Sequence, residues 1–99
     1  MAKKYTYGHD FSITEAQNLV KAFLKLKTKD EVEGFLHDLL TPQELEDLAR
    51  RLEAARILFK KATFLEVKKE LGMSPNTIQK IYQKLWYGKG GFKTILKRL

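Results

Sequence analysis

The sequence predicts an all-α protein of six helices, and three observations lead to this class. Apolar residues recur three and four positions apart through most of the chain, which is the period of a helix face. No segment alternates apolar and polar residues with the two-residue period of a half-buried strand. Several Ser or Thr residues precede a glutamate by three positions, as at many helix starts. We expect a flexible arm over 1–11 and one helical domain over 12–99.

The first two predicted helices are short, and each opens on a capping-box pattern. Ser12 and Thr28, each with a glutamate three residues on, begin helices over 13–26 and 29–40. Helices of this length are marginal alone, so their apolar stripes must be buried against something. A monomer of this length could cover part of them, while an interleaved dimer would cover more. The stripes consist of Ala16, Leu19, Val20, Phe23 and Leu24, and of Val32, Phe35, Leu36, Leu39 and Leu40.

The third predicted helix, over 42–60, is the longest. Thr41 caps it, with a proline at the first helical position and a glutamate at the third. The helix also carries three arginines, at Arg50, Arg51 and Arg56. An arginine in the middle of a helix is usually solvated or forms a surface ion pair. One of these three can instead line a cleft that faces a later helix. The apolar face comprises Leu45, Leu48, Ala49, Leu52, Ala55 and either Leu58 or Phe59.

Residues 64–86 predict a helix-turn-helix. Thr63 is the N-cap of its first helix, and Gly72 follows that helix where a residue tolerant of positive φ is needed. Ser74 caps the second helix, which has a proline at its first position. A small apolar set is expected to fix the angle between the two helices. It contains Val67, Leu71, Met73, Ile78 and Ile81.

The second helix of this motif, over 75–86, has an outward face with amides, a hydroxyl and lysines but no carboxylate. Such groups hydrogen-bond base edges and phosphates in the major groove of double-stranded DNA. We expect Asn76, Gln79 and Lys80 to read bases; the alternative is an ordinary helical hairpin with a solvated basic face. Hydroxyls at the helix N-terminus and nearby lysines are expected to bind phosphates. They are Ser74, Thr77, Lys84, Lys68 and Lys69.

The chain beyond the helix-turn-helix is predicted to break and then form one more helix. A glycine-rich stretch over 86–91 is too flexible to continue a helix, and it lacks the features of a nucleotide-binding loop. A short helix over 92–99 follows. Its inward residues are expected to be Phe92, Ile95, Leu96 and Leu99.

The net charge of +7 is unevenly placed along the chain. Residues 1–55 hold 8 Lys and Arg against 10 Asp and Glu, whereas residues 56–99 hold 11 against 2. The positive excess therefore surrounds the predicted helix-turn-helix, as a polyanion-binding surface requires. A charge that served only solubility would be spread more evenly.

Composition argues against several other classes of protein. The chain has no cysteine, so disulfides and thiolate chemistry are excluded, and a cytoplasmic location is compatible. No apolar run approaches the roughly 20 residues of a membrane span, and no signal-peptide segment opens the sequence. His9 and His37 lack further ligands or a nucleophile at useful spacing. We therefore expect no enzyme, no metal site and no membrane partner.

Several short motifs follow one another in a characteristic order and spacing along the chain. They are LLTP at 39–42, LARRL at 48–52, ELG at 70–72, Ser74 with Thr77 and Ile78, LWYG at 85–88 and GGF at 90–92. In these motifs the chain, from about residue 15 to the end, resembles the Trp-repressor superfamily, and most closely its YerC/YecD-like branch. The resemblance implies an intertwined all-helical homodimer that binds DNA as a bacterial transcription regulator.

The same resemblance bears on a small-molecule effector. In the Trp repressor, tryptophan fills a pocket between the long helix and the second helix of the helix-turn-helix. Thr41 and Arg51 match that pocket, so they mark a possible effector pocket here. Lys80 and Ile81 stand where the repressor has arginine and glycine, and Lys84 where it has serine. Lysine cannot replace the flat guanidinium of an arginine that stacks on the indole ring. We therefore expect no tryptophan corepressor and no other cofactor, and leave open whether another effector binds.

Two other functions stay open at this point. An all-helical interaction module with a basic face that meets an acidic protein predicts no preferred DNA sequence. An RNA-binding protein predicts preference for structured or single-stranded RNA, but the chain lacks the usual aromatic stacking platform. The operator, the regulated genes and the direction of regulation do not follow from the sequence.

Overall fold

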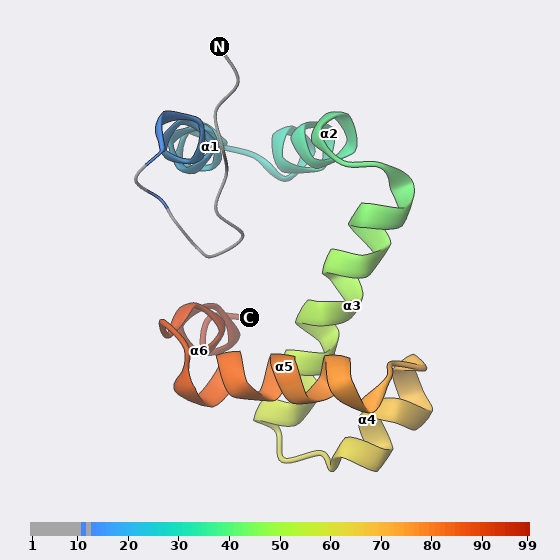
Figure 1. Ribbon diagram of the computed structural model, residues 1–99. Coiled ribbons are helices and arrows are strands. Elements are labelled where there is room, and N and C mark those ends of the chain that lie inside the picture. Colours follow the sequence, from blue (N-terminus) through green and yellow to red (C-terminus); the bar gives the residue numbers. More distant parts are fainter. Residues whose placement is uncertain (1–10, 12) are drawn as a thin grey trace. The chain divides into compact units, whose positions relative to one another are not determined.

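The computed structural model describes residues 11 and 13–99, and its regular structure is entirely helical (Figure 1). The prediction of an all-α chain with six helices is confirmed. None of the helices in this part is long and apolar enough to cross a membrane. The predicted arm falls outside the described residues except for Phe11. The helices are α1 (Thr14–Lys25), α2 (Lys29–Leu39), α3 (Pro42–Phe59), α4 (Phe64–Leu71), α5 (Pro75–Tyr87) and α6 (Gly91–Leu96).

The described chain divides into two compact units, and the boundary between them lies between Leu39 and Leu40. The first contains α1 and α2, and the second contains α3 to α6. The assignment of residues 12–99 to one domain stays a prediction.

The first unit shows how its two helices begin. The N-cap of α1 is Ile13, which makes no side-chain cap hydrogen bond; the predicted cap, Ser12, lies outside the described residues. At α2, the Thr28 hydroxyl accepts a hydrogen bond from the Glu31 amide at 3.1 Å. The Glu31 carboxylate accepts from the amide of Lys27, at 2.8 Å, which is one residue earlier than a capping box requires.

The apolar stripes of the first unit lie largely open in the single chain. No residue of α1 or α2 is buried, and Leu24 is 79% exposed. Phe23 and Phe35 do pack edge to face across the two helices, with ring centroids 5.3 Å apart. Exposed apolar patches of this kind are typical of contact surfaces. The exposed members are Leu19, Val20, Phe23, Leu24, Val32 and Leu39.

The long helix α3 begins at the predicted capping box. The Glu44 amide donates to the Thr41 hydroxyl at 3.1 Å, and the Thr41 amide donates to the Glu44 carboxylate at 2.9 Å. Its apolar face is buried only toward the C-terminal end, at Ala54, Ala55 and Leu58. The N-terminal half of the predicted apolar face stays exposed in the single chain. The exposed members are Leu45, Leu48 and Leu52.

The core of the second unit forms where α5 crosses the C-terminal part of α3 (Figure 1). Val67, Ile78 and Leu85 are its largest fully buried side chains. Helices α4 and α6 also pack on α3 and α5, so this core holds the helix-turn-helix on the long helix. The buried set is completed by Ala54, Ala55, Leu58, Met73, Ile81 and Leu96.

The last helix differs from the sequence prediction. It ends at Leu96, and only Leu96 is buried, while Phe92 packs half-buried against the core. Ile95 is 41% exposed and Leu99 is 73% exposed, so the expectation that both point inward is wrong for the single chain. Residues 97 and 98 form a turn after Leu96, so Leu99 lies beyond the last helix.

Candidate nucleic-acid interface

The helix-turn-helix begins at Thr63, where local hydrogen bonds fix the start of α4. The Glu66 amide donates to the Thr63 hydroxyl at 3.2 Å, and the Thr63 amide donates to the Glu66 carboxylate at 3.0 Å. The bond from the Thr63 amide, together with the Thr63 side chain, holds the pKa of Glu66 below its ordinary value, because both favour the charged carboxylate. The predicted capping box is therefore formed, and one of the few acidic groups in this region is engaged by the backbone.

Gly72 ends α4 in the left-handed conformation, with a φ of 64°. Its amide donates to the carbonyl of Lys68 at 2.8 Å, so the turn closes on the helix that it follows. A side chain at this φ would strain the backbone, which is why the sequence signal at Gly72 was informative. The turn then leads directly into α5 at Ser74.

The start of α5 is held by its predicted cap. The Thr77 amide donates to the Ser74 hydroxyl at 3.3 Å, and the two hydroxyl oxygens lie 3.0 Å apart. Ser74 is exposed and Thr77 is half-buried. Both hydroxyls therefore lie at the N-terminal end of α5, where a helix attracts negative groups.

The two faces of α5 are sharply divided. Ile78, Ile81 and Leu85 are buried, and Tyr82 packs half-buried against the same core. The polar side chains that are exposed between them are Gln79, Lys80, Gln83 and Lys84. None of residues 71–99 is acidic. The structure brings the three predicted base readers together on this helix, whereas two of the predicted phosphate ligands lie on α4. The exposed predicted residues are Asn76, Gln79, Lys80 and Lys84 on α5, and Lys68 and Lys69 on α4.

Two of the three arginines of α3 make polar contacts of different kinds. Arg56 forms an ion pair with Glu53, with 2.9 Å between Nε and Oε2, and Arg56 holds the pKa of Glu53 below its usual value. Arg50 donates a hydrogen bond to the carbonyl oxygen of Leu71. That carbonyl is one of the free groups at the C-terminal end of α4, so Arg50 ties the long helix to the turn.

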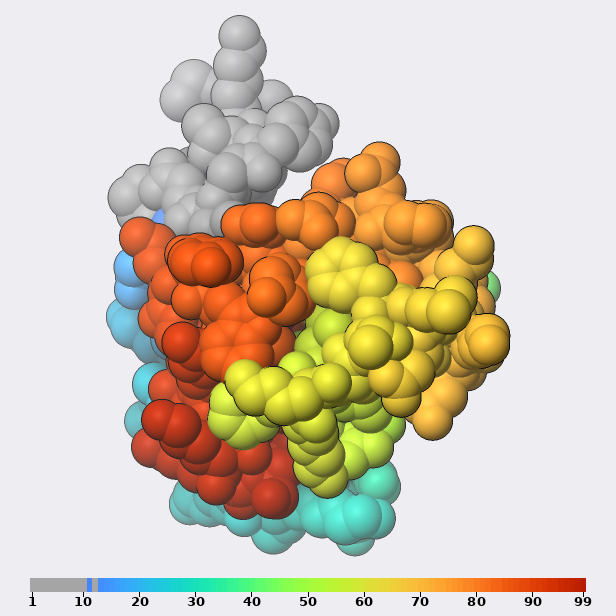
Figure 2. Space-filling model, turned by 90° about the horizontal axis from the view of Figure 1, so that it is seen from below, coloured from blue at the N-terminus to red at the C-terminus, as the bar shows by residue number. Residues whose placement is uncertain are grey.

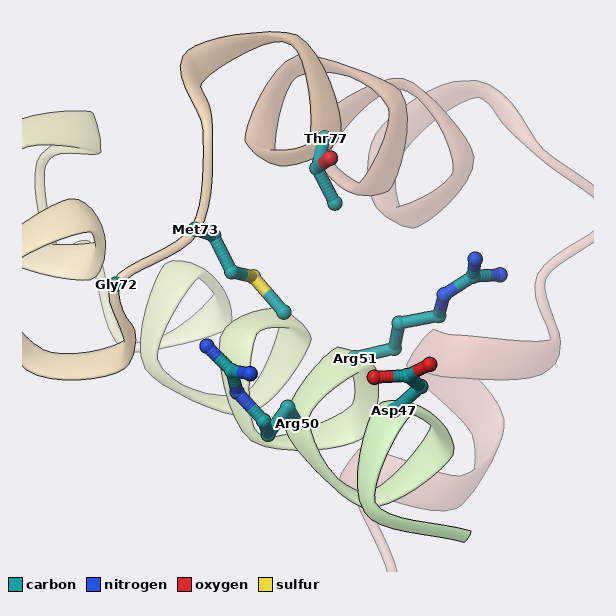
Figure 3. Close-up of a pocket in the computed structure, with 6 residues that line it drawn as sticks. All are labelled: Asp47, Arg50, Arg51, Gly72, Met73 and Thr77. Atoms are coloured by element: carbon teal, nitrogen blue, oxygen red, sulfur yellow. The ribbon is translucent and has the colours of Figure 1, made fainter. Parts of the chain in front are cut away.

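A pocket of about 270 Å³ lies beside Arg50, between α3, the turn and the start of α5. Figure 3 shows Arg50 and Arg51 leaving α3 in different directions, with Thr77 facing them from α5. The lining includes Arg51, as the effector-pocket prediction requires, but not Thr41, whose hydroxyl caps α3. The sequence indicates Arg50 among the arginines that can line a cleft, but it does not assign the remaining members to a pocket. The full lining is Asp47, Arg50, Arg51, Gly72, Met73 and Thr77.

Within residues 11 and 13–99, no three His, Cys, Asp or Glu side chains gather as metal ligands would. His37 is exposed and lies 3.6 Å from the carboxylate of Asp38. Among the described polar groups, the acid-free face of α5 is an arrangement that suits an anionic partner.

These features define an all-helical helix-turn-helix protein, and the chain belongs to the Trp repressor family, whose model ("Trp repressor protein") matches residues 14–99. It is 35% identical over 85 residues to "Uncharacterized protein YerC" of Bacillus subtilis (strain 168), a match that covers 86% of this chain and 82% of YerC. It also resembles the crystal structure of a TrpR like protein from Eubacterium eligens ATCC 27750. That match has a TM-score of 0.82 and 31% identity, and covers 89% of this chain and 91% of the other. The predicted resemblance to the YerC-like branch is confirmed.

Proposed function

We propose that the protein is a cytoplasmic transcription regulator that reads a specific DNA sequence in the major groove with α5. The observation that carries this proposal is the outward face of α5, which offers amides and lysines, holds no carboxylate and stands on a buried apolar core. Amide and ammonium groups are the donors and acceptors that base edges require. Membership of the Trp repressor family supports a regulatory role.

The outward face of α5, which we call the reading face, is also preorganised for binding. Gly72, Ser74 and the bond from Arg50 to Leu71 fix the turn before α5, and Ile78 and Ile81 fix the rotation of α5 about its axis. A rigid reading helix loses little conformational freedom on binding, so more of the contact energy is available for discrimination between sequences.

We further propose that the protein works as a homodimer. The exposed apolar residues of α1, α2 and the N-terminal half of α3 support this, since a second copy would remove them from water. One helix-turn-helix contacts few bases, whereas two related by a two-fold axis read an inverted repeat with half-sites about one helical turn apart.

We propose that no tryptophan corepressor is needed. Lys80 supplies no flat guanidinium to stack on an indole, and Ile81 is a β-branched residue in the core. The pocket beside Arg50 and Arg51 has no aromatic residue in its lining. Thr41 and Arg51 remain candidate contacts for some other effector.

The Gln79→Ala variant tests the reading of bases. Gln79 is exposed near the middle of α5, where it can pair with an adenine, so its loss should cost about 1–3 kcal/mol on the preferred site and little on random DNA. Fluorescence anisotropy with both duplexes at one salt concentration measures the difference.

The Lys84→Ala variant is the matched control on the same helix. As a phosphate ligand, Lys84 should contribute alike to both duplexes, and its loss should lower the slope of log affinity against log salt by about 0.9. Equal losses on both duplexes for Gln79→Ala would remove Gln79 from the base-reading set.

A further inference from the structure

Four aromatic rings gather where α3, α4 and α5 meet. Trp86 of α5 lies 6.0 Å from Phe59 of α3 and 6.4 Å from Tyr82, measured between ring centroids. Tyr82 in turn lies 5.2 Å from Phe64 at the start of α4. All four rings are only partly buried, and all pack on the apolar core, which holds them in place at this surface. They belong to Phe59, Phe64, Tyr82 and Trp86.

Two lysines from different segments converge on Trp86. The Nζ atom of Lys61, in the connection between α3 and α4, lies 4.6 Å from the indole centroid, and that of Lys93 in α6 lies 5.1 Å from it. Both lie within the range of cation–π attraction, which fixes two ammonium groups at one place. Figure 2 shows the α3–α4 connection in yellow-green beside α5 in orange and α6 in red, on one face of the molecule.

The backbone of Lys61 indicates that its side chain matters. Lys61 has a φ of 74°, and among the described residues it is the sole non-glycine residue with positive φ. Glycine would adopt this conformation at the end of α3 without strain, whereas lysine is strained there. The chain therefore holds a lysine, rather than a glycine, at a left-handed position that costs backbone energy.

The charges around the two lysines differ between the two sides of the cluster. On the α4 side the charge is mixed, because Lys60 and Lys61 line a shallow hollow with Glu66 and Glu70, and the amide of Thr63 donates to the carboxylate of Glu66. On the other side, α5, α6 and the connection between them carry no acidic residue. Lys89 adds a further exposed ammonium group in that connection.

The spacing along α5 places this cluster at one edge of the reading face. Trp86 follows Gln83 by three residues and Gln79 by seven, so the three share one side of the helix. Lys80 and Lys84, four residues apart, lie along the other edge. A recognition helix in the major groove runs between two phosphate backbones, so each edge of the helix faces one strand.

We propose that Lys61 and Lys93, held on Trp86, bind phosphates of the DNA strand that borders the Gln79 and Gln83 side of α5. The inference rests on the proposed function and adds a second set of phosphate ligands to it. The two lysines act on every DNA sequence alike, because phosphates carry no sequence information. They therefore set the affinity and the salt dependence of binding, while α5 sets the sequence preference.

The Lys61→Gln/Lys93→Gln variant tests the pair through the salt dependence of DNA binding. Loss of two phosphate contacts should lower the slope of log affinity against log salt by about 1.8. The wild-type protein should then lose about 12-fold more affinity than the variant between about 50 mM and 200 mM salt. The Lys21→Gln/Lys25→Gln variant, which removes two exposed charges from α1, should leave the slope unchanged.

Lys61→Gly separates phosphate binding from a purely structural role. Glycine suits the φ of Lys61, so this variant should unfold at the same or a higher temperature while its slope falls by about 0.9. A wild-type slope in both folded variants would overturn the proposal. If the wild-type protein selected no DNA sequence, the proposed function would fail instead. If it selected a sequence but the salt slopes of these variants were unchanged, only the proposal for the two lysines would fail.

Discussion

Replacing Ile78 with alanine is expected to lower the free energy of unfolding of the unit formed by Leu40–Leu99 by about 2–5 kcal/mol. Ile78 is fully buried where α5 crosses α3, so the truncation loses apolar contacts and leaves a cavity that rigid helices cannot fill. Since native domains are stable by only about 5–15 kcal/mol, this is a large part of the total. DNA binding should weaken with it, because the same side chain orients the reading face.

Leu65→Ala is the control for this experiment. It also truncates a large aliphatic side chain in the helix-turn-helix, but Leu65 is 59% exposed, so the loss should stay within about 0.5 kcal/mol. Urea unfolding followed by the fluorescence of Trp86, the single tryptophan of the chain, measures both variants at one protein concentration. Equal losses at the two positions would contradict the description of the core.

Leu24→Asp is expected to raise the dissociation constant of the proposed homodimer by at least about 30-fold. Leu24 is 79% exposed in the single chain, so the change costs an isolated protomer little. In a dimer that covers the apolar stripe of α1, it would place a carboxylate in an apolar contact, which costs at least about 2 kcal/mol. Sedimentation equilibrium over a range of protein concentrations measures the constant.

Asn18→Asp adds the same charge to the opposite face of α1 and should leave the association unchanged. A similar circular dichroism spectrum for the two variants would show that both fold. If Leu24→Asp associated as the wild type does, the stripe of α1 would not be the dimer surface, and the exposed residues of α2 and α3 would have to be covered in another way.

The parts of the fold that the sequence predicted well depend on local interactions. Thr41 and Thr63 each stand three residues before the glutamate that completes a capping box, and both boxes form. Gly72 adopts the left-handed conformation that its place in the turn required. Ser74 caps α5 through the amide of Thr77, so the bounds of the helix-turn-helix were predictable to within a residue.

The parts that were missed depend on which segments meet in space. The helical period cannot say which residues of a six-residue helix reach the core, and Ile95 was wrongly placed inside for that reason. Lys61 and Lys93 are 32 positions apart, so nothing in their spacing connects them through Trp86. The hydrogen bond from Arg50 to the carbonyl of Leu71 could not be predicted from the sequence either, although the sequence did predict that an arginine could line a cleft.

The central claim, that a pair of α5 helices reads a DNA sequence, is tested most directly by selecting bound sequences from a random pool of duplex DNA. The proposal predicts enrichment of an inverted repeat whose half-sites are centred about one helical turn apart, because two reading helices related by a two-fold axis enter successive major grooves. Retention of DNA that depends on salt but enriches no sequence would contradict it, and the basic face of residues 56–99 would then be a surface for polyanions of any sequence.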